Sequence, residues 1–147
     1  MARLLALAWA AAFALASAGA LADFRAVGEE GAILYDGPSR QATPLFVVSR
    51  DYPLEVIAQT DAWVKVRDHT GALSWIERRR LGERRTVLVT APLAEAKARP
   101  EDAAPVAFSA VRDVALEYLG PAAGGWVRVR HAEGTEGYVR ASAVWGE

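Results

Sequence analysis

Apolar and charged residues alternate strictly in two short segments of this chain. In Trp63–Arg67 the valines Val64 and Val66 alternate with longer side chains, and Trp126–Arg130 repeats the pattern. Such alternation predicts a strand with one face in a core and the other in water. Further strands are expected at Ala32–Tyr35, Leu45–Val48, Leu54–Ala58, Trp75–Glu77, Thr86–Thr90, Val106–Ala110, Ala115–Leu119 and Tyr138–Arg140. Because turn-forming Gly and Pro residues separate these segments, the chain is predicted to be all-β, as a barrel or a sandwich.

One segment has a composition that favours a helix. It is Leu93–Arg99, and Pro92 and Pro100 bracket it. Helices usually end before a proline. We therefore expect a loop here, with a single helical turn at most.

An internal repeat indicates how the strands are grouped. Trp63–Arg67 matches Trp126–Arg130 at a spacing of 63 residues, and the match continues downstream through a Gly turn and the next strand. Upstream, Arg50-Asp51 matches Arg112-Asp113 at a spacing of 62 residues. Self-similarity at a fixed period predicts repeated structural units. We expect two units, Asp23–Leu81 and Arg85–Glu147.

The two units are expected to pack against each other. A domain of about 60 residues buries only about 60% of its unfolded surface and is marginally stable alone. The junction Gly82–Arg84 is short and is not a flexible Gly/Ser spacer. The sequence thus predicts two small barrels in tandem with little freedom between them.

The N-terminal residues have the features of a secretory signal peptide. Arg3 precedes the apolar stretch Leu4–Ala16, and small residues then lead to Ala20-Leu21-Ala22. This order of regions predicts a signal helix, Met1–Ala22, that is cleaved on export to the periplasm or beyond. The apolar stretch is shorter than the roughly 20 residues of a membrane span, so we expect no stable span after cleavage. The alternative is an uncleaved anchor helix.

The composition excludes several classes of function. The chain has no Cys, which removes a thiol nucleophile, a redox pair and a thiolate zinc site. Its formal net charge is −1, whereas a nucleic-acid-binding domain is usually strongly basic. The sequence also contains no Gly-x-Ser-x-Gly elbow, no Gly-rich phosphate loop and no His-Glu-x-x-His. We expect no catalysis, no cofactor and no nucleic-acid partner; a hydrolase that uses carboxylates is the weaker alternative.

The repeated segments resemble a known family, the bacterial Src-homology-3-like (SH3b) domain. In that family a GW-x-x-V strand, a short turn, a GW-V strand and a final apolar residue follow one another. The first unit is similar to it at Trp63–Arg67, Gly71, Ser74-Trp75-Ile76 and Leu81, and the second at Gly125–Val129, Gly134, Gly137-Tyr138-Val139 and Val144. Tyr35–Ser39, with the sequence Y-D-G-P-S, is similar to the family's R-x-G-P-S segment but lacks the usual Arg. The resemblance implies a five- or six-stranded antiparallel SH3-like barrel for each unit.

The candidate ligand-binding residues are aromatic. Trp63 shares a strand face with Lys65 and Arg67, and Trp126 repeats this arrangement, so both are expected on the wetter face. A partly exposed Trp beside cations can stack on a peptide or on a sugar. The alternative is that each Trp folds over its own barrel and contacts a neighbouring Arg through a cation–π interaction. The other candidates are Trp75 and Tyr138 at equivalent positions on the next strand, and Tyr35 near a bordering loop.

The remaining polar features are weaker candidates. Arg78–Arg80 and Arg84-Arg85 form a basic cluster at the junction of the units, able to hold phosphate or a carboxylate. The alternative is a solvated strand end, paired with Glu77 and Glu83. His69 and His131 are expected to be exposed turn residues, and we predict no metal site.

Two functions remain open. Because many SH3b domains are thought to bind wall peptides or partner proteins, the resemblance implies an exported module that recognises cell-wall peptide or a related envelope ligand. The alternative is a periplasmic protein-interaction or assembly factor without affinity for the wall. An SH3-like barrel can bind extended peptides in an aromatic groove, or pair through an exposed strand edge.

Overall fold

The computed structural model describes residues 21–147. The expected signal peptide, Met1–Ala22, lies outside the described residues except for its last two positions. Within residues 21–147, no helix has the length and apolarity needed to cross a membrane.

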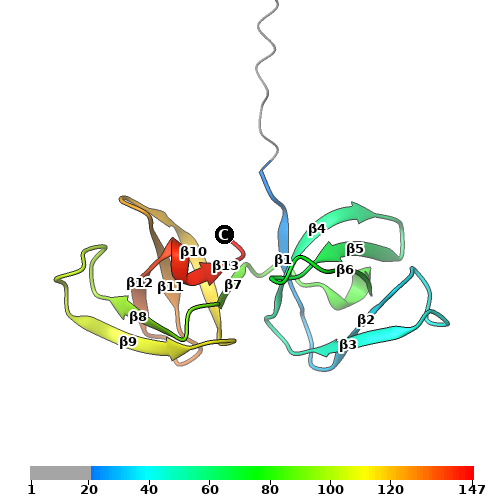
Figure 1. Ribbon diagram of the computed structural model, residues 1–147, viewed down its shortest axis with the longest axis horizontal. Coiled ribbons are helices and arrows are strands. Elements are labelled where there is room, and N and C mark those ends of the chain that lie inside the picture. The colour runs from blue at the N-terminus through cyan, green and yellow to red at the C-terminus, as the bar shows by residue number, and fades with distance from the viewer. Residues whose placement is uncertain (1–20) are drawn as a thin grey trace, which may run out of the picture.

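The described chain forms two antiparallel sheets, each curled into a small barrel (Figure 1). The N-terminal barrel has six strands in the order β1-β4-β5-β6-β2-β3. These are β1 (Phe24–Ala26), β2 (Ala32–Tyr35), β3 (Pro44–Val48), β4 (Pro53–Gln59), β5 (Trp63–Arg67) and β6 (Leu73–Glu77), followed by the 3-10 helix η1 (Arg78–Arg80). The C-terminal barrel has seven strands in the order β13-β7-β10-β11-β12-β8-β9. These are β7 (Thr86–Val89), β8 (Leu93–Lys97), β9 (Val106–Val111), β10 (Ala115–Ala122), β11 (Trp126–Arg130), β12 (Glu136–Arg140) and β13 (Val144–Trp145), with η2 (Ala141–Ala143) before β13.

The chain turns at the same positions in both barrels. Asp51 and Asp113 have positive φ angles of 67° and 70°. Their amides donate hydrogen bonds to the carbonyls of Val27 and Val89, at 2.8 and 2.9 Å. Bulges follow at matching points of β4 and β10, and the tryptophan-led strands β5 and β11 lie between equivalent neighbours. The internal repeat therefore corresponds to two copies of one fold.

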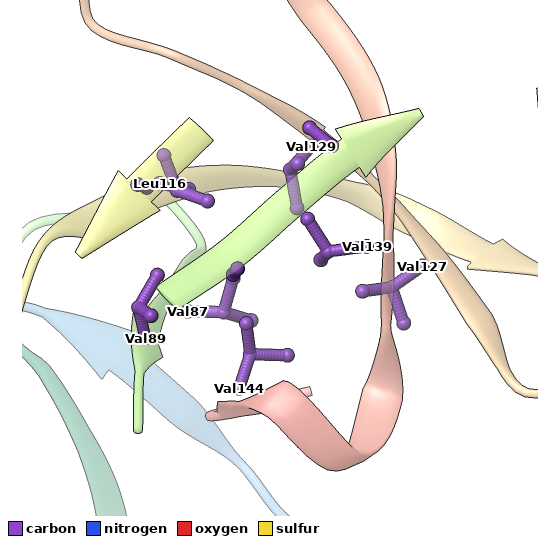
Figure 2. Packing of buried hydrophobic residues seen from close by; sticks show 10 residues of the cluster. Val87, Val89, Leu116, Val127, Val129, Val139 and Val144 are labelled. Carbon is purple, nitrogen blue, oxygen red and sulfur yellow. The ribbon is translucent and has the colours of Figure 1, made fainter. Parts of the chain in front are cut away.

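Each barrel has its own core, built from alternate strand positions. In the N-terminal barrel Val64 and Val66 are fully buried and pack with Leu34, Leu54 and Ile76. Figure 2 shows the C-terminal core, where the converging side chains are those of Val87, Val89, Leu116, Val127, Val129, Val139 and Val144. Full burial of one such side chain contributes about 1.5–3 kcal/mol. These cores fix the alternation, and the opposite strand faces carry the aromatic and charged residues.

Every strand expected from the alternation is present, with ends moved by a few residues. The expected loop at Leu93–Arg99 is wrong, because Leu93–Lys97 forms β8 and pairs with β9. Ala94 and Ala96 of β8 are buried in the core. A Cβ atom at Gly137 would lie only 2.9 Å from the Cβ of Ala96, so only small side chains fit between β8 and β12. Close packing overrides the helix-favouring composition here.

The two barrels are packed together through side chains at their facing ends. The Thr86 hydroxyl donates a hydrogen bond of 2.6 Å to the carbonyl of Asp51. The rings of Phe24 and Trp145 meet edge-to-face with centroids 5.0 Å apart. Arg84 lies 3.6 Å from the Asp51 carboxylate. Because apolar and polar contacts both join the barrels, we expect them to tumble as one body.

Candidate ligand-binding site

An aromatic face lies on the outer side of β2, β5 and β6. The rings of Tyr35 and Trp63 meet edge-to-face with centroids 5.6 Å apart. Trp75 is the cross-strand partner of both Tyr35 and Lys65. The Lys65 Nζ atom lies 6.0 Å from the centre of the Trp75 ring. We call Tyr35, Trp63, Trp75 and Lys65 the aromatic face; all four side chains are half-buried.

This face has the properties of a stacking surface. Half-buried Tyr and Trp rings offer rigid apolar area at low entropic cost and keep a polar group for hydrogen bonding. Three strands each supply one ring, so the barrel itself holds their arrangement. The structure thus brings together three of the five predicted site residues, Tyr35, Trp63 and Trp75.

A carboxylate ties the β2–β3 loop to the aromatic face. Glu77 is the cross-strand partner of Trp63. Its carboxylate accepts hydrogen bonds from Nε and Nη2 of Arg40, at 3.1 and 2.8 Å, and from Nε of Arg79, at 2.8 Å. The hydrogen bonds from Arg40 and then Arg79 lower the pKa of Glu77 to about 2. The carboxylate therefore stays charged near neutral pH and holds the loop beside Tyr35.

The equivalent face of the C-terminal barrel is closed. Trp126 is only 4% exposed. The guanidinium of Arg140, its cross-strand partner, lies 4.2 Å from the ring centre. Arg140 also pairs with Asp102 of the β8–β9 loop at 2.6 Å. The expected exposure of Trp126 is therefore wrong: the shielded arrangement with a cation–π contact describes Trp126, whereas Trp63 stays half-buried.

Tyr138 lies in a cationic setting. It is half-buried, and its cross-strand partners are Arg128 on β11 and Lys97 on β8. Lys97 thus takes the place that Tyr35 has beside Trp75 in the first barrel. The C-terminal face is cationic where the N-terminal face is aromatic.

The sequence analysis did not identify the residues that make the two faces chemically different, namely Arg40, Lys97, Asp102 and Arg140. The spacing of 63 residues that aligns the two tryptophans also aligns Glu77 with Arg140, so this charge reversal is visible in the repeat. Arg40 and Asp102 lie in long loops between strands, and no sequence pattern marks them.

The basic cluster at the junction is occupied by contacts within the chain. The contacts are Arg78 to the Thr60 carbonyl, Arg79 to Glu77, Arg80 to Glu29, Arg84 to Asp51 and Glu117, and Arg85 to the Gly146 carbonyl. Burial alone would raise the pKa of Glu117, but the hydrogen bonds from Arg84 and Arg130 lower it. Of the two expected partners, only Glu77 pairs with these arginines within the described part of the chain. This arrangement favours the strand-end alternative over an open anion site.

The two histidines have different surroundings. His69 is exposed, and its Nδ1 atom is hydrogen-bonded to the Tyr52 hydroxyl at 2.7 Å. Burial, with a smaller contribution from the charge of Asp68, raises the pKa of Tyr52 to about 12. The expected exposure is wrong for His131, which is half-buried with its ring 5.4 Å from that of Phe108. Between residues 21 and 147, no group of three or more His, Asp or Glu side chains is placed to hold a metal ion.

Comparison with known proteins identifies the same two segments. The family model of the bacterial SH3 domain matches the chain twice, over residues 28–83 and 92–146. Each match spans most of one barrel. No curated protein matches the chain.

Several solved structures are similar to the chain at low identity. NlpC1 from Trichomonas vaginalis is 16% identical, with a TM-score of 0.39, over 86% of this chain and 46% of its own. NlpC2 from the same organism is 17% identical, with a TM-score of 0.39, over 86% and 49%. An NlpC/P60 family protein from Bacillus cereus is 15% identical, with a TM-score of 0.37, over 84% and 56%. The chain spans about half the length of these proteins.

Proposed function

Because the chain belongs to the bacterial SH3 domain family, we propose that it is an exported binding protein without catalytic activity, which recognises a cell-wall peptide or a related envelope ligand. The observation that carries the proposal is the aromatic face. Three half-buried rings from three strands lie beside Lys65, and the Glu77–Arg40 pair holds the adjoining loop. The apolar stretch Leu4–Ala16 supports export.

The chemistry of the face suits a short peptide. Large, rigid aromatic side chains dominate the binding energy of many interfaces. The ammonium of Lys65 adds an electrostatic attraction for a carboxylate or a carbonyl group. A peptide with apolar and acidic groups would therefore meet complementary groups here.

Sedimentation with purified cell-wall sacculi tests the proposal. We expect the protein to be retained, and the double variant Trp63→Ala/Trp75→Ala to lose at least about tenfold in affinity, the scale of hot-spot residues. Tyr138→Ala removes a ring at the equivalent position of the other barrel and should leave retention unchanged. Absence of retention, or equal loss in both variants, would contradict recognition by the aromatic face.

A second candidate function is docking of a partner protein along β3. This strand forms one edge of the N-terminal sheet. Phe46 and Val47 are 55% and 72% exposed, and the strand contains no charged residue. Natural proteins usually protect such edges with charges or a covering segment. A hollow of about 310 Å³ lies beside the strand, between Val47 and Tyr52 on one side and Leu88 of the other barrel. An extended segment of a partner can add a strand at such an edge.

The variant Val47→Lys separates this candidate from the first. A charge at the edge should abolish chemical crosslinking to a periplasmic partner, while retention by sacculi stays at the wild-type level. If the same partner is crosslinked equally well to the variant, β3 is not the docking edge.

A further inference from the structure

We propose that the C-terminal barrel carries a carboxylate-binding site, in which Arg140 and Lys97 receive the anion above Trp126 and Asp102 occupies the position of the ligand in its absence. This site is separate from the aromatic face and goes beyond the proposed function. Its test does not require a wall ligand.

The site is a hollow of about 290 Å³ on the closed face. It is lined by Trp126, Lys97, Arg140 and Leu93, and also by the acidic residues Glu95 and Asp102. This volume is at the lower end of the range for small-molecule pockets. It suits a small acid or the end of a peptide.

Arg140 is held in an orientation that suits a carboxylate. Its guanidinium lies 4.2 Å from the centre of the Trp126 ring, and Nη1 donates a hydrogen bond of 3.3 Å to the carbonyl of Gly124. A second nitrogen, Nη2, donates to Asp102 Oδ2 at 2.6 Å. A planar guanidinium held on one face by a ring presents its donors in a fixed fork, which carboxylates match.

The present partners of both cations are displaceable. The Asp102 side chain is 78% exposed, in the loop between β8 and β9. Lys97 pairs at 3.3 Å with Glu95, whose side chain is 52% exposed. Solvent screens the exposed carboxylate of each pair, which weakens the pair. An external carboxylate therefore displaces Asp102 once its concentration exceeds the effective concentration of the tethered side chain.

The N-terminal barrel lacks the same chemistry at the same place. Tyr35 takes the position of Lys97, and Glu77 takes that of Arg140. At these two positions the N-terminal barrel has a tyrosine and a carboxylate instead of two cations. The two barrels thus provide an internal comparison within one molecule.

Nuclear magnetic resonance titration of the purified two-barrel protein tests the site at constant ionic strength. The probes are sodium acetate and its neutral isostere acetamide, followed by N-acetyl-glycylglycine and its C-terminal amide. We expect saturable shifts of the Trp126 indole N–H and the Arg140 Nε–H signals with both acids, and none with acetamide or the amide. The indole signal of Trp63, which lies opposite Glu77, should not saturate with acetate.

Three variants decide whether Asp102 is the internal competitor. Asp102→Asn should tighten acetate binding at least threefold, because it removes the competing carboxylate. Lys97→Met should weaken binding at least threefold. Glu101→Gln, which removes the neighbouring carboxylate of the same loop, should leave the affinity unchanged.

The outcomes are distinct. If Asp102→Asn binds acetate no more tightly than the wild type, or if acetamide shifts the signals as acetate does, the proposal is overturned. Tighter binding of the peptide acid than of acetate assigns the site to peptide ends, and equal binding assigns it to small acids. Loss of sacculus retention in the aromatic-face variants has no bearing on this titration, so the two proposals fail separately.

Discussion

Replacing Arg40 with Gln removes the larger of the two contributions to the low pKa of Glu77. In the folded protein this pKa is about 2, against 4.5 for an unperturbed carboxyl group. A tenfold change in proton affinity corresponds to about 1.36 kcal/mol, so the net shift of the Glu77 pKa corresponds to at most about 3.4 kcal/mol of stability. Both arginine side chains are 59% exposed, and solvent screening reduces this figure. We expect Arg40→Gln to destabilise the protein at neutral pH by only a fraction of this limit.

The pH dependence follows from the direction of the pKa change. Because the folded-state pKa lies below the unfolded one, the contribution is complete above about pH 4.5 and is lost as the pH falls toward 2. Urea unfolding should therefore show a deficit for Arg40→Gln at pH 7 that shrinks toward zero near pH 2. A ¹³C titration of the Glu77 carboxyl should show its midpoint rising toward 4.5 in the variant.

A matched control lies in the equivalent loop of the other barrel. Arg99 pairs at 3.6 Å with Glu101, and both side chains are at least 60% exposed. We expect Arg99→Gln to change neither stability nor the Glu77 titration. A Glu77 midpoint near 4.5 in the wild type, or an Arg40→Gln deficit that is the same at both pH values, would refute the reasoning.

Three further predictions concern packing and charge. Ser74 is buried, and its hydroxyl has no hydrogen-bond partner among the described residues. Ser74→Ala should therefore raise the free energy of unfolding in urea by about 1 kcal/mol, and a decrease of that size would contradict this. Gly137→Ala would place a Cβ atom 2.9 Å from that of Ala96 and should cost about 1–3 kcal/mol of unfolding free energy. The control Gly37→Ala meets only an ordinary contact at 3.5 Å and should cost much less. Equal effects of the two variants would argue against close packing of β8 and β12. Because the pKa of Tyr52 is raised to about 12, the stability of the protein should fall as the pH rises from 10 to 12. Tyr52→Phe should make this fall less steep. The same pH dependence of stability in the variant and the wild type would exclude Tyr52 as the cause.

The arrangement of the barrels is testable as a whole. The contacts of Thr86 with Asp51 and of Phe24 with Trp145 predict a fixed orientation of the two barrels. Small-angle X-ray scattering should fit a single rigid body. A scattering curve that requires an ensemble of barrel orientations would contradict this.

The fold was accessible from the sequence because its signals are local. Alternation in Trp63–Arg67 follows from one buried and one more exposed strand face, and the repeat contains the same strand pattern a second time. The error at β8 has a different origin. Alanine favours a helix by intrinsic propensity, but Ala94 and Ala96 lie in the core beside Gly137, where only small side chains fit. The segment does carry a strand signal, because Ala94 and Ala96 alternate with Glu95 and Lys97. Its helix-favouring composition and the flanking prolines outweighed that signal.

The site was harder to predict from the sequence. Alternation indicates which face of a strand a residue occupies, but not which side chains cover that face. Trp63 and Trp126 begin equivalent strands and occupy equivalent register positions. Their exposure differs because Glu77 lies opposite one and Arg140 lies opposite the other. Covering groups come from the neighbouring strand and from a distant loop, which alternation does not describe.

Each barrel ties a long loop to its sheet with an ion pair, and the two pairs have opposite polarity. In the N-terminal barrel Glu77, the last residue of β6, pairs with Arg40 of the β2–β3 loop. In the C-terminal barrel Arg140, the last residue of β12, pairs with Asp102 of the β8–β9 loop. Either polarity ties the loop to the barrel. Only the second polarity places the cation of the pair over the strand-leading tryptophan, Trp126, because a carboxylate gains nothing over the negative face of an indole. Exchange of the charges therefore preserves the fold while it closes one tryptophan and leaves the other half-buried. A duplicated barrel can acquire a second ligand preference in this way without any change in its core.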